Sequence, residues 1–240
     1  MPGPLAFIRS QVCVTLPTPE GSYAGKTVVI TGSNTGLGKE AARHFARLGV
    51  SKLILAVRSL NNGNEAKADI ESTTQCAQDV IEVWELDMAS YDSVKAFTKR
   101  IDQELPRVDI FIANAGKATT SFSMAEGNES TITVNVVSTF LLASLLLPKL
   151  RRTAKEFGIR PTLTIVASEV HAWAKFAERK AAEGKIFDIL SDEKSWDKYK
   201  VDRYMTSKLL EVLAIQALAS RSRGGDVVTI NCVNPGFCYS

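Results

Sequence analysis

The sequence has little excess of charge of either sign. Its 240 residues contain 29 Lys and Arg against 26 Asp and Glu, which gives a formal net charge of +3. The basic residues are scattered along the chain, whereas a nucleic-acid-binding surface usually gathers them on one face or element. We therefore expect no nucleic-acid partner.

Long apolar runs are also missing. A membrane-spanning helix needs about 20 consecutive apolar residues, and the longest run here, residues 140–147, is shorter and is followed by Pro148. We interpret this run as a buried helix. The opening residues, MPGPLAFIRS, lack the basic segment and the roughly 7 to 15 apolar residues of a secretory signal. These absences predict a cytoplasmic protein without a membrane span.

The few cysteines follow no recognisable pattern. Cys13, Cys76, Cys232 and Cys238 have neither the spacing of a metal site nor that of a disulfide framework. We expect no bound metal and a reducing compartment.

What the chain does contain is a regular alternation of short β-branched runs and longer amphipathic stretches. Runs that are apolar throughout are usually buried on both faces, which favours a parallel sheet with helices on either side. The expected strands are residues 27–30, 53–57, 80–86, 108–113, 163–167 and 227–233. The expected helices are residues 37–48, 64–74, 90–104, 128–156 and 203–222. We predict the α/β class, with a doubly wound parallel sheet in one domain at 25–240 that follows an N-terminal arm at 1–24.

One interval interrupts this alternation. About three dozen residues separate the strand that ends near Ala167 from the helix that contains Tyr204, and we place an insertion at about 171–200. Connections of this length usually form functional lids or carry helices of their own. The stretch AWAKFAERKAA could form such a helix, and a solvated excursion is the alternative.

A glycine-rich segment, TGSNTGLG at residues 31–38, directly follows the first expected strand. Glycine permits positive φ and a close approach of the backbone to a pyrophosphate, and the following helix would point its free N–H groups at the anion. The spacing is neither that of the usual dinucleotide fingerprint nor that of a P-loop. A plain glycine-rich connector therefore remains open. We predict a phosphate site made by Gly32, Ser33, Asn34, Gly36, Leu37 and Gly38.

Three further motifs follow in order along the chain. They are Asn-Ala-Gly at 114–116, Tyr-Met-Thr-Ser-Lys at 204–208 and Asn-Pro-Gly at 234–236. Together with the glycine-rich segment they resemble the short-chain dehydrogenases/reductases, over about residues 25–240. The long interval before Tyr204 and the sequence SEVH at 168–171 resemble the retinol-dehydrogenase-like branch, including its fungal members. The resemblance implies a Rossmann-type fold and an oxidoreductase that uses a nicotinamide cofactor.

The end of the second expected strand bears on the choice between NAD and NADP. Arg58 follows this strand, and no acidic residue stands beside it. In dinucleotide-binding folds an acid near this position binds the ribose 2′-hydroxyl of NAD, whereas an arginine accommodates the 2′-phosphate of NADP. We therefore predict NADP(H), and a solvated arginine is the alternative. The resemblance implies further cofactor contacts at Asp87, Met88, Asn114, Ala115, Gly116, Tyr204, Lys208, Pro235 and Gly236.

Tyr204 and Lys208 are four residues apart in a helical stretch, so their side chains share one face. Because a phenol with a pKa near 10 is a poor acid–base group, we expect the Lys208 ammonium and an oxidised nicotinamide to lower the Tyr204 pKa. An ordinary surface pair is the alternative. Ser168 ends the fifth expected strand, where its hydroxyl can hold a carbonyl oxygen. The resemblance adds Asn135, which would hold a water in a proton relay and is at least a hydrogen-bonded core amide.

These residues predict hydride transfer between a nicotinamide and a ketone or secondary alcohol. Ser168 and Tyr204 would bind the oxygen, Tyr204 would exchange the proton and Lys208 would hold the ribose. The insertion contains aromatic residues that favour an apolar substrate, such as a retinoid, a steroid or a polyketide-like ketone, although they could instead anchor the insertion. These aromatic residues are Trp173, Phe176, Phe187 and Trp196.

A second hypothesis comes from the end of the sequence, which stops at residues 239–240, soon after Pro235 and Gly236. Relatives usually continue, so we expect the usual seventh strand to be missing and the sixth to lie at a sheet edge. Such shortening favours an NADP-binding protein of the same fold without redox activity, either a nucleotide-sensing regulator or a scaffold for a non-redox step. The intact set of catalytic residues favours the enzyme. The oligomeric state stays open, a homodimer included.

Overall fold

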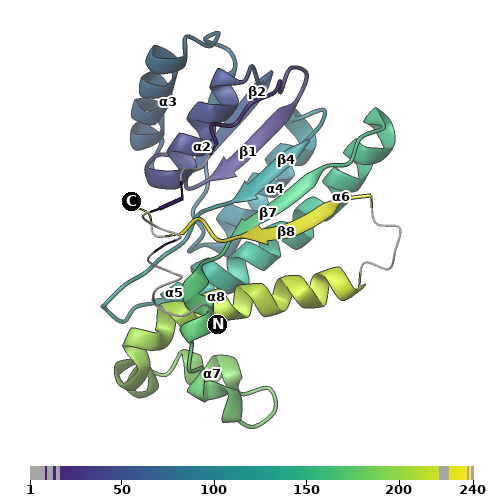
Figure 1. Cartoon of the computed structure of the whole chain (residues 1–240). Helices are drawn as coiled ribbons and strands as arrows, with labels where there is room; N and C mark the ends of the chain where they lie inside the picture. The colour runs from purple at the N-terminus through teal and green to yellow at the C-terminus, as the bar shows by residue number, and fades with distance from the viewer. Residues whose placement is uncertain (1–8, 10–12, 15–16, 222–226, 237, 239–240) are drawn as a thin grey trace.

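The computed structural model describes residues 9, 13–14, 17–221, 227–236 and 238 (Figure 1). Most of the arm predicted at 1–24 and all of residues 239–240 lie outside this part of the chain.

Six strands form one parallel sheet in the order β3-β2-β1-β4-β7-β8. They are β1 (Thr27–Thr31), β2 (Lys52–Val57), β3 (Ile81–Glu85), β4 (Ile110–Ala113), β7 (Thr162–Val166) and β8 (Thr229–Val233). The predicted fold class is confirmed, with a strand at each of the six expected positions. Chain order reverses between β1 and β4, and such a switch point leaves a crevice at the carboxyl ends of the strands.

Helices cover both faces of the sheet because successive strand residues point to opposite sides. Val28 and Ile30 of β1 pack with buried residues of one group of helices, whereas Val29 between them packs with the other. The first group is α2 (Gly36–Arg47) and α3 (Leu60–Thr74). The second is α4 (Tyr91–Glu104), α6 (Thr139–Phe157) and α8 (Glu193–Arg221).

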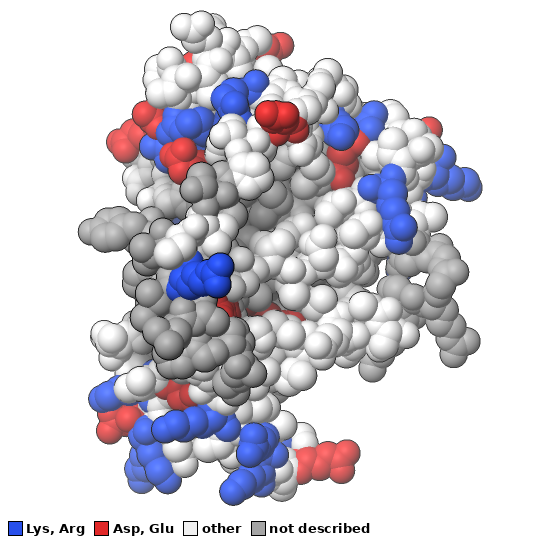
Figure 2. Space-filling model, in the orientation of Figure 1, with Lys and Arg blue, Asp and Glu red and all other residues white. Residues whose placement is uncertain are grey.

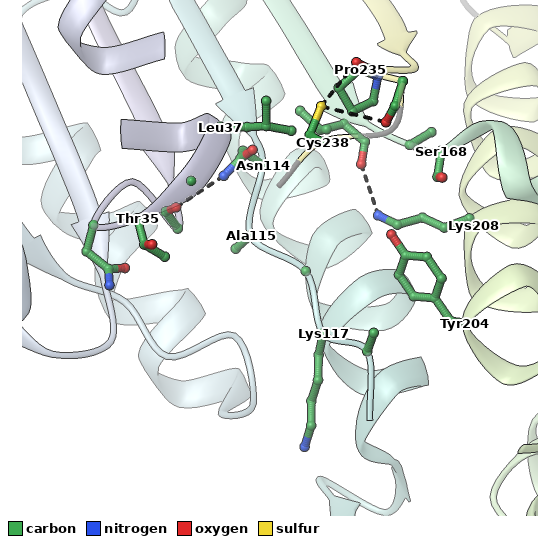
Figure 3. A pocket seen from close by; sticks show the side chains of 18 residues that line it. Thr35, Leu37, Asn114, Ala115, Lys117, Ser168, Tyr204, Lys208, Pro235 and Cys238 are labelled. Carbon is green, nitrogen blue, oxygen red and sulfur yellow. Dashed lines mark hydrogen bonds between the residues drawn. The ribbon is translucent and has the colours of Figure 1, made fainter. Parts of the chain in front are cut away.

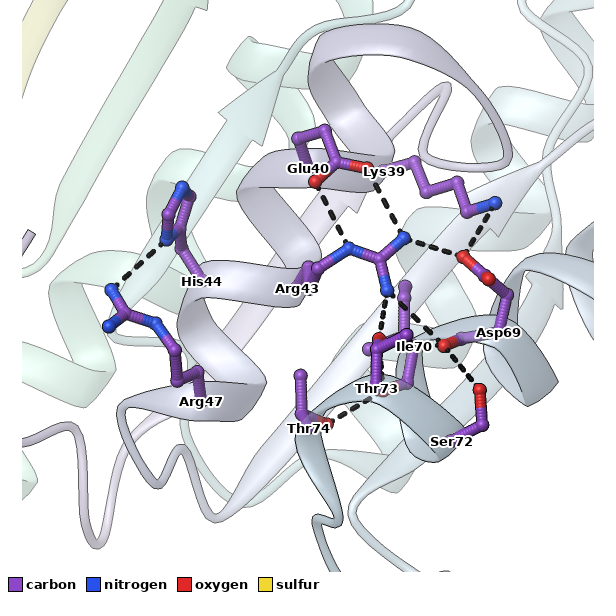
Figure 4. Close-up of polar contacts among 10 residues, drawn as sticks. All are labelled: Lys39, Glu40, Arg43, His44, Arg47, Asp69, Ile70, Ser72, Thr73 and Thr74. Atoms are coloured by element: carbon purple, nitrogen blue, oxygen red, sulfur yellow. Dashed lines mark hydrogen bonds and ion pairs between the residues drawn. The ribbon is translucent and has the colours of Figure 1, made fainter. Parts of the chain in front are cut away.

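A polar network joins α2 to α3 (Figure 4). The Arg43 guanidinium donates to the Glu40 carboxylate on α2 and pairs with Asp69 on α3, which Lys39 also contacts at 2.8 Å. The hydrogen bonds from Arg43 and Lys39 lower the pKa of Asp69 to about 2. Asp69 therefore stays ionised across the neutral range, and the network holds the helix that follows the glycine turn in place.

The long apolar helix expected within residues 128–156 is continuous through Pro148. Leucines before and after it, Leu146 and Leu150, are buried in the core, whereas Pro148 itself is on the exposed side. The carbonyl that a proline leaves without its helical partner can there reach water. The segment Ser130–Phe157 is long and apolar enough to cross a membrane, with a mean hydropathy of 1.8, but 72% of its apolar window is buried inside the protein. We therefore interpret it as a helix that packs in the core against the sheet.

The insertion consists of short elements rather than one helix over AWAKFAERKAA. It contains two 3₁₀ turns, η2 (Glu169–Trp173) and η3 (Ala177–Lys180), and a short helix, α7 (Ile186–Leu190). Between the two turns Phe176 has a φ of 43°, a left-handed value that a continuous helix does not permit. The Asp202 carboxylate on α8 accepts the backbone N–H of Lys175 and of Phe176 at 3.0 and 3.1 Å. These bonds interrupt the helix that was predicted here and connect the insertion to α8. The helix α8 itself begins at Glu193 rather than near residue 203.

Two further features complete the described fold. A small hairpin, β5 (Met124–Ala125) and β6 (Asn128–Glu129), precedes α5 (Ser130–Ile132) and was not predicted. β8 pairs with β7 and forms the edge of the sheet in the described residues, as expected for the sixth strand. On the face in Figure 2, Lys and Arg are interspersed with Asp and Glu over most of the described surface, and several basic side chains gather at its lower end.

Candidate active site

The glycine turn joins β1 to α2 at the carboxyl edge of the sheet. Gly32 and Gly36 have φ values of 63° and 54°, which residues with a Cβ rarely adopt. A Cβ on Gly32 would lie 2.9 Å from the Cα of Ala115, and one on Gly38 would lie 2.5 Å from the carbonyl oxygen of Gly32. Gly32 and Gly36 therefore permit the bend of the backbone. Gly32 and Gly38 permit close packing of the turn against the end of β4 and against α2.

The amino end of α2 is left free to bind an anion. Thr35, its N-cap residue, makes no side-chain capping hydrogen bond, and no acidic residue lies in the first turn. The unpaired N–H groups and the positive end of the helix dipole both favour a negative group at this position.

The turn after β4 is fixed to the glycine turn by hydrogen bonds. The fully buried Thr31 hydroxyl accepts the backbone N–H of Asn114 at 3.0 Å and that of Ala115 at 2.9 Å. The Asn114 side-chain amide donates in return to the carbonyl oxygens of Thr31 and Gly32 at 3.0 and 3.2 Å. Thr31 was not among the predicted site residues, although it opens the TGSNTGLG segment.

Two cavities of about 450 Å³ each lie along this edge and have common walls at the glycine turn and at residues 115–118. Because these walls are common, the cavities form one groove. Its first part extends to Ser168, Tyr204 and Lys208, and its second to Arg58 and Asp87. The groove is thus long in one direction, which suits a dinucleotide.

Most of the predicted residues lie in the walls of this groove. The first part contains Gly32, Asn34, Gly36, Leu37, Asn114, Ala115, Gly116, Ser168, Tyr204, Lys208, Pro235 and Gly236. The second part adds Arg58, Asp87 and Met88. Residues from both ends of the chain therefore meet at one edge of the sheet.

Three predicted residues are absent from the described walls of the groove. The buried Ser33 hydroxyl donates to the Ile30 carbonyl at 2.9 Å, and Gly38 packs under the turn. Asn135 is fully buried in η1, a π-helical segment (Thr133–Ser138). These three residues support the walls from behind.

Asn135 makes nearly all the hydrogen bonds its side chain can make. Its carbonyl oxygen accepts the Lys117 N–H at 2.7 Å, and its NH₂ group donates to the Lys117 carbonyl and to the Ser207 hydroxyl, both at 2.9 Å. Asn135 therefore connects the turn after β4 to α8. The core amide expected at this position is present, and a water relay through it stays a prediction.

Asp87 lines the second part of the groove and also acts as a turn former. One of its carboxylate oxygens accepts the Ala89 N–H at 2.8 Å, and the other makes no hydrogen bond to the described residues. Arg58 stands at the end of β2 in the same wall, with an exposed side chain.

Ser168, Tyr204 and Lys208 are brought together at the other end (Figure 3). Ser168 lies just beyond β7 and caps η2, its hydroxyl accepting the Val170 N–H at 3.4 Å. Tyr204 and Lys208 are one turn apart on α8, and the Lys208 Nζ lies 5.7 Å from the centroid of the Tyr204 ring. A half-buried phenol, a hydroxyl and an ammonium therefore face one cavity.

The pKa of Tyr204 is raised above its ordinary value of 10.0, opposite to the predicted lowering. Burial of the phenol is the largest cause, the Glu211 carboxylate is the next, and the Ser168 hydroxyl opposes them. The expected effect of Lys208 is missing because its ammonium is paired with Glu211, at 2.9 Å from Oε1. No unbalanced positive charge therefore faces the phenol.

Glu211 and Ser207 belong to this site and were not predicted. Both lie on the buried face of α8, with Ser207 fully buried and Glu211 only 2% exposed. The signal that could have found Glu211 is its spacing, because a carboxylate three residues after Lys208 on a helix reaches the same face. Ser207 lies within the Tyr-Met-Thr-Ser-Lys motif, but its partner Asn135 is far away in the sequence, so the motif gives no sign of this bond.

Comparisons with known proteins identify the family of this chain. A family model described as short chain dehydrogenase matches residues 26–158. The chain is 58% identical over 237 residues to the short chain dehydrogenase/reductase dmxR8 of Cryptosporiopsis sp. (strain 8999), with 98% of this chain and 73% of that protein covered. It is 44% identical to the short chain dehydrogenase atnD of Emericella nidulans, with 97% and 73% covered.

A solved structure shows the same fold. The short chain dehydrogenase of Escherichia coli CFT073 complexed with NADPH matches with a TM-score of 0.65 and 24% identity, over 91% of this chain and 80% of that one. None of these three matches by its description singles out a retinol-dehydrogenase-like branch. The family model and the two fungal relatives establish that this chain belongs to the short-chain dehydrogenase family of oxidoreductases.

Proposed function

We propose that this chain binds NADP(H) along the groove and reduces a ketone to a secondary alcohol, with Tyr204 as the proton donor. The observation that carries the proposal is the common cavity: the Tyr204 phenol and the Ser168 hydroxyl line the same walls as the glycine turn. A nucleotide held by the turn would therefore place its other end beside the two hydroxyls.

The residues present fit a nicotinamide dinucleotide. The glycine turn and the free amino end of α2 suit a pyrophosphate. Arg58 in the second part of the groove suits a 2′-phosphate and favours NADP over NAD. The Escherichia coli neighbour named above is itself complexed with NADPH. When bound, the cofactor supplies the hydride.

The protein's own groups would manage the oxygen and its proton. Ser168 and Tyr204 would donate hydrogen bonds to the ketone oxygen, which stabilises the negative charge that develops as hydride reaches the carbon. The Tyr204 O–H then transfers its proton to that oxygen, the alcohol forms, and the phenolate is reprotonated from solvent. A raised Tyr204 pKa keeps the phenol protonated at neutral pH, which favours reduction as the working direction.

An apolar substrate stays a prediction. Phe176 and Trp196 are 8% and 5% exposed, and Trp196 packs edge-on against Phe122 at 5.7 Å between ring centroids. These two aromatic residues anchor the insertion. Trp173 and Phe187 are 48% and 41% exposed and are the two that could meet a substrate.

The test is the loss of NADPH absorbance with a panel of ketones that range from small to steroid-sized, for the wild-type protein and for Tyr204→Phe. We expect turnover by the wild type and a fall of about 10²- to 10⁴-fold in kcat for the variant, because it lacks the transferred proton. The dissociation constant for NADPH should change by no more than about twofold, since the ring stays in place. Tight NADPH binding without turnover of any ketone would instead support a non-redox NADP-binding protein of the same fold.

A further inference from the structure

The Lys208 ammonium has all three of its hydrogen-bond donors occupied inside the protein. It donates to the Val166 carbonyl at 2.9 Å and to the two carboxylate oxygens of Glu211 at 2.9 and 3.1 Å. Lys208 is 4% exposed and Glu211 is 2% exposed. An ammonium offers three N–H donors, so Glu211 takes two of the three that Lys208 has.

The ion pair of Lys208 and Glu211 changes the electrostatic field at the neighbouring Tyr204 phenol. The Glu211 carboxylate lies 2.9 Å from the Lys208 ammonium and has the opposite charge, so it opposes the field of the ammonium at nearby groups. Both charges act strongly here because the pair is buried and solvent screens it little. The Lys208 Nζ lies 5.7 Å from the centroid of the Tyr204 ring, close enough for an unpaired ammonium to stabilise a phenolate. With Glu211 ionised, that stabilisation is lost.

We propose that Glu211 is a positioning residue: its carboxylate balances the Lys208 charge and so keeps Tyr204 in the protonated form that donates to a ketone. The catalytic meaning of this inference rests on the proposed function, whereas the coupling of charges on α8 does not. The raised Tyr204 pKa, with Glu211 as its second cause, agrees with the geometry.

The same carboxylate is itself close to titrating. Burial raises the pKa of Glu211 to about 7, and the Lys208 ammonium opposes that rise only in part. As the pH falls below this value, Glu211 takes up a proton and the pair gains a net positive charge. The field at Tyr204 then favours the phenolate more than it does at higher pH.

Other elements packed against α8 contribute little to this balance. They are η2, η1, β8, α5 and α7, of which η1 and α5 have no titratable side chain. The titratable groups on the rest are Glu169, His171, Cys232 and Asp188. None of these is among the causes that shift the pKa of Tyr204 or of Glu211. The coupling is therefore confined to one face of α8.

The test is a titration of tyrosinate absorbance in the ligand-free protein, with the curve of the matching Tyr204→Phe variant subtracted in each background. In Glu211→Gln, which keeps the shape and removes the charge, we expect Tyr204 to ionise about one pH unit lower than in the wild type. Glu211→Asp keeps the charge and should stay near the wild-type curve. Glu71→Gln removes a carboxylate from an i,i+4 pair with Lys67 on α3, across the sheet, and should leave the curve unchanged.

Coincident curves for wild type and Glu211→Gln would overturn the inference, as would a shift in Glu211→Asp as large as that in Glu211→Gln. If Glu211→Gln does not fold, Glu211→Asp and Glu71→Gln still decide, because a large shift in Glu211→Asp alone points to shape rather than charge. Where ketone reduction is measurable, the alkaline fall of kcat should also move to lower pH in Glu211→Gln. If the titration shifts in Glu211→Gln but no ketone is reduced, the charge coupling is supported and the proposed function is contradicted. If a ketone is reduced but the titration does not shift, the proposed function is supported and the charge coupling is contradicted.

Discussion

The two ends of the groove are held in shape by different forces. At the nucleotide end, backbone and small side chains pack so closely that a Cβ on Gly32 would come within 2.9 Å of Ala115. At the catalytic end, side chains from η1, from α8 and from the turn that follows β7 meet, and buried charges determine how they ionise. Lys208 and Glu211 there are 4% and 2% exposed.

This difference matters for what a motif can predict. At the nucleotide end, the residues that need the freedom of glycine are close together in the sequence, so the short segment TGSNTGLG identifies that end although its packing partner Ala115 lies elsewhere in the chain. Charge balance in a buried site depends on every ionised group within a few ångströms, because solvent screens little there. The properties of the catalytic end therefore depend on residues outside the motifs.

The largest effect is expected from breaking the nucleotide end with Gly32→Ala. The substitution forces a Cβ onto a φ of +63° and into the Ala115 backbone, which together should lower the free energy of unfolding by about 2–4 kcal/mol. NADPH affinity should fall by more than about 100-fold, since the turn cannot keep its shape. Chemical denaturation and fluorescence titration with NADPH measure the two quantities.

Gly49→Ala is the matched control for this change. Gly49 has a φ of +75°, and nothing lies within 4 Å of a Cβ built on it. The control should therefore lose only the conformational part, about 1–2 kcal/mol, and should bind NADPH as the wild type does. Equal losses in both variants would show that backbone strain alone, and not contact with Ala115, governs the turn.

Sequence reasoning predicted the sheet well because its strands are buried on both faces and read as apolar runs. The helical pattern over 128–156 continues through Pro148, where burial of the leucines on either side outweighs the cost of one proline. Sequence reasoning failed in the insertion, where the Asp202 carboxylate binds the Lys175 and Phe176 N–H groups and ends a helical pattern. That failure comes from contacts distant in sequence, which local periodicity does not contain.

At the site, sequence reasoning found the residues better than their states. The motifs placed Ser168, Tyr204 and Lys208 in one cavity, yet the direction of the Tyr204 pKa shift was wrong. The reason is Glu211, which belongs to no motif and pairs with Lys208 in the folded protein. A residue type at a given spacing indicates which chemistry is available, and its surroundings decide how the group ionises.

A smaller effect should come from Arg58→Ala, which sharpens the assignment of the nucleotide end. The Arg58 guanidinium lies in the wall of the second part of the groove, and its removal should weaken NADPH binding about tenfold through loss of a charged hydrogen bond. NADH has no 2′-phosphate, so its affinity should stay within about twofold of wild type. Equal weakening of both nucleotides in titration calorimetry would instead assign Arg58 a role in shaping the groove.

The smallest effect is expected at the catalytic end, from Asp202→Asn. The variant keeps the shape of the side chain but loses its charge, and an NH₂ group, which cannot accept an N–H, replaces one of the two oxygens that accept the Lys175 and Phe176 N–H groups at 3.0 and 3.1 Å. These two amides should exchange with solvent about three to ten times faster, which corresponds to roughly 1 kcal/mol of local stability. The Ser195 N–H, held in the same way by Asp192 at 2.8 Å, is the internal control and should not change. Site-resolved hydrogen exchange measures all three amides in one experiment. If Lys175 and Phe176 exchange at the wild-type rate, the insertion is held by packing of its buried aromatic residues, and the catalytic end resembles the nucleotide end more closely than its charges suggest.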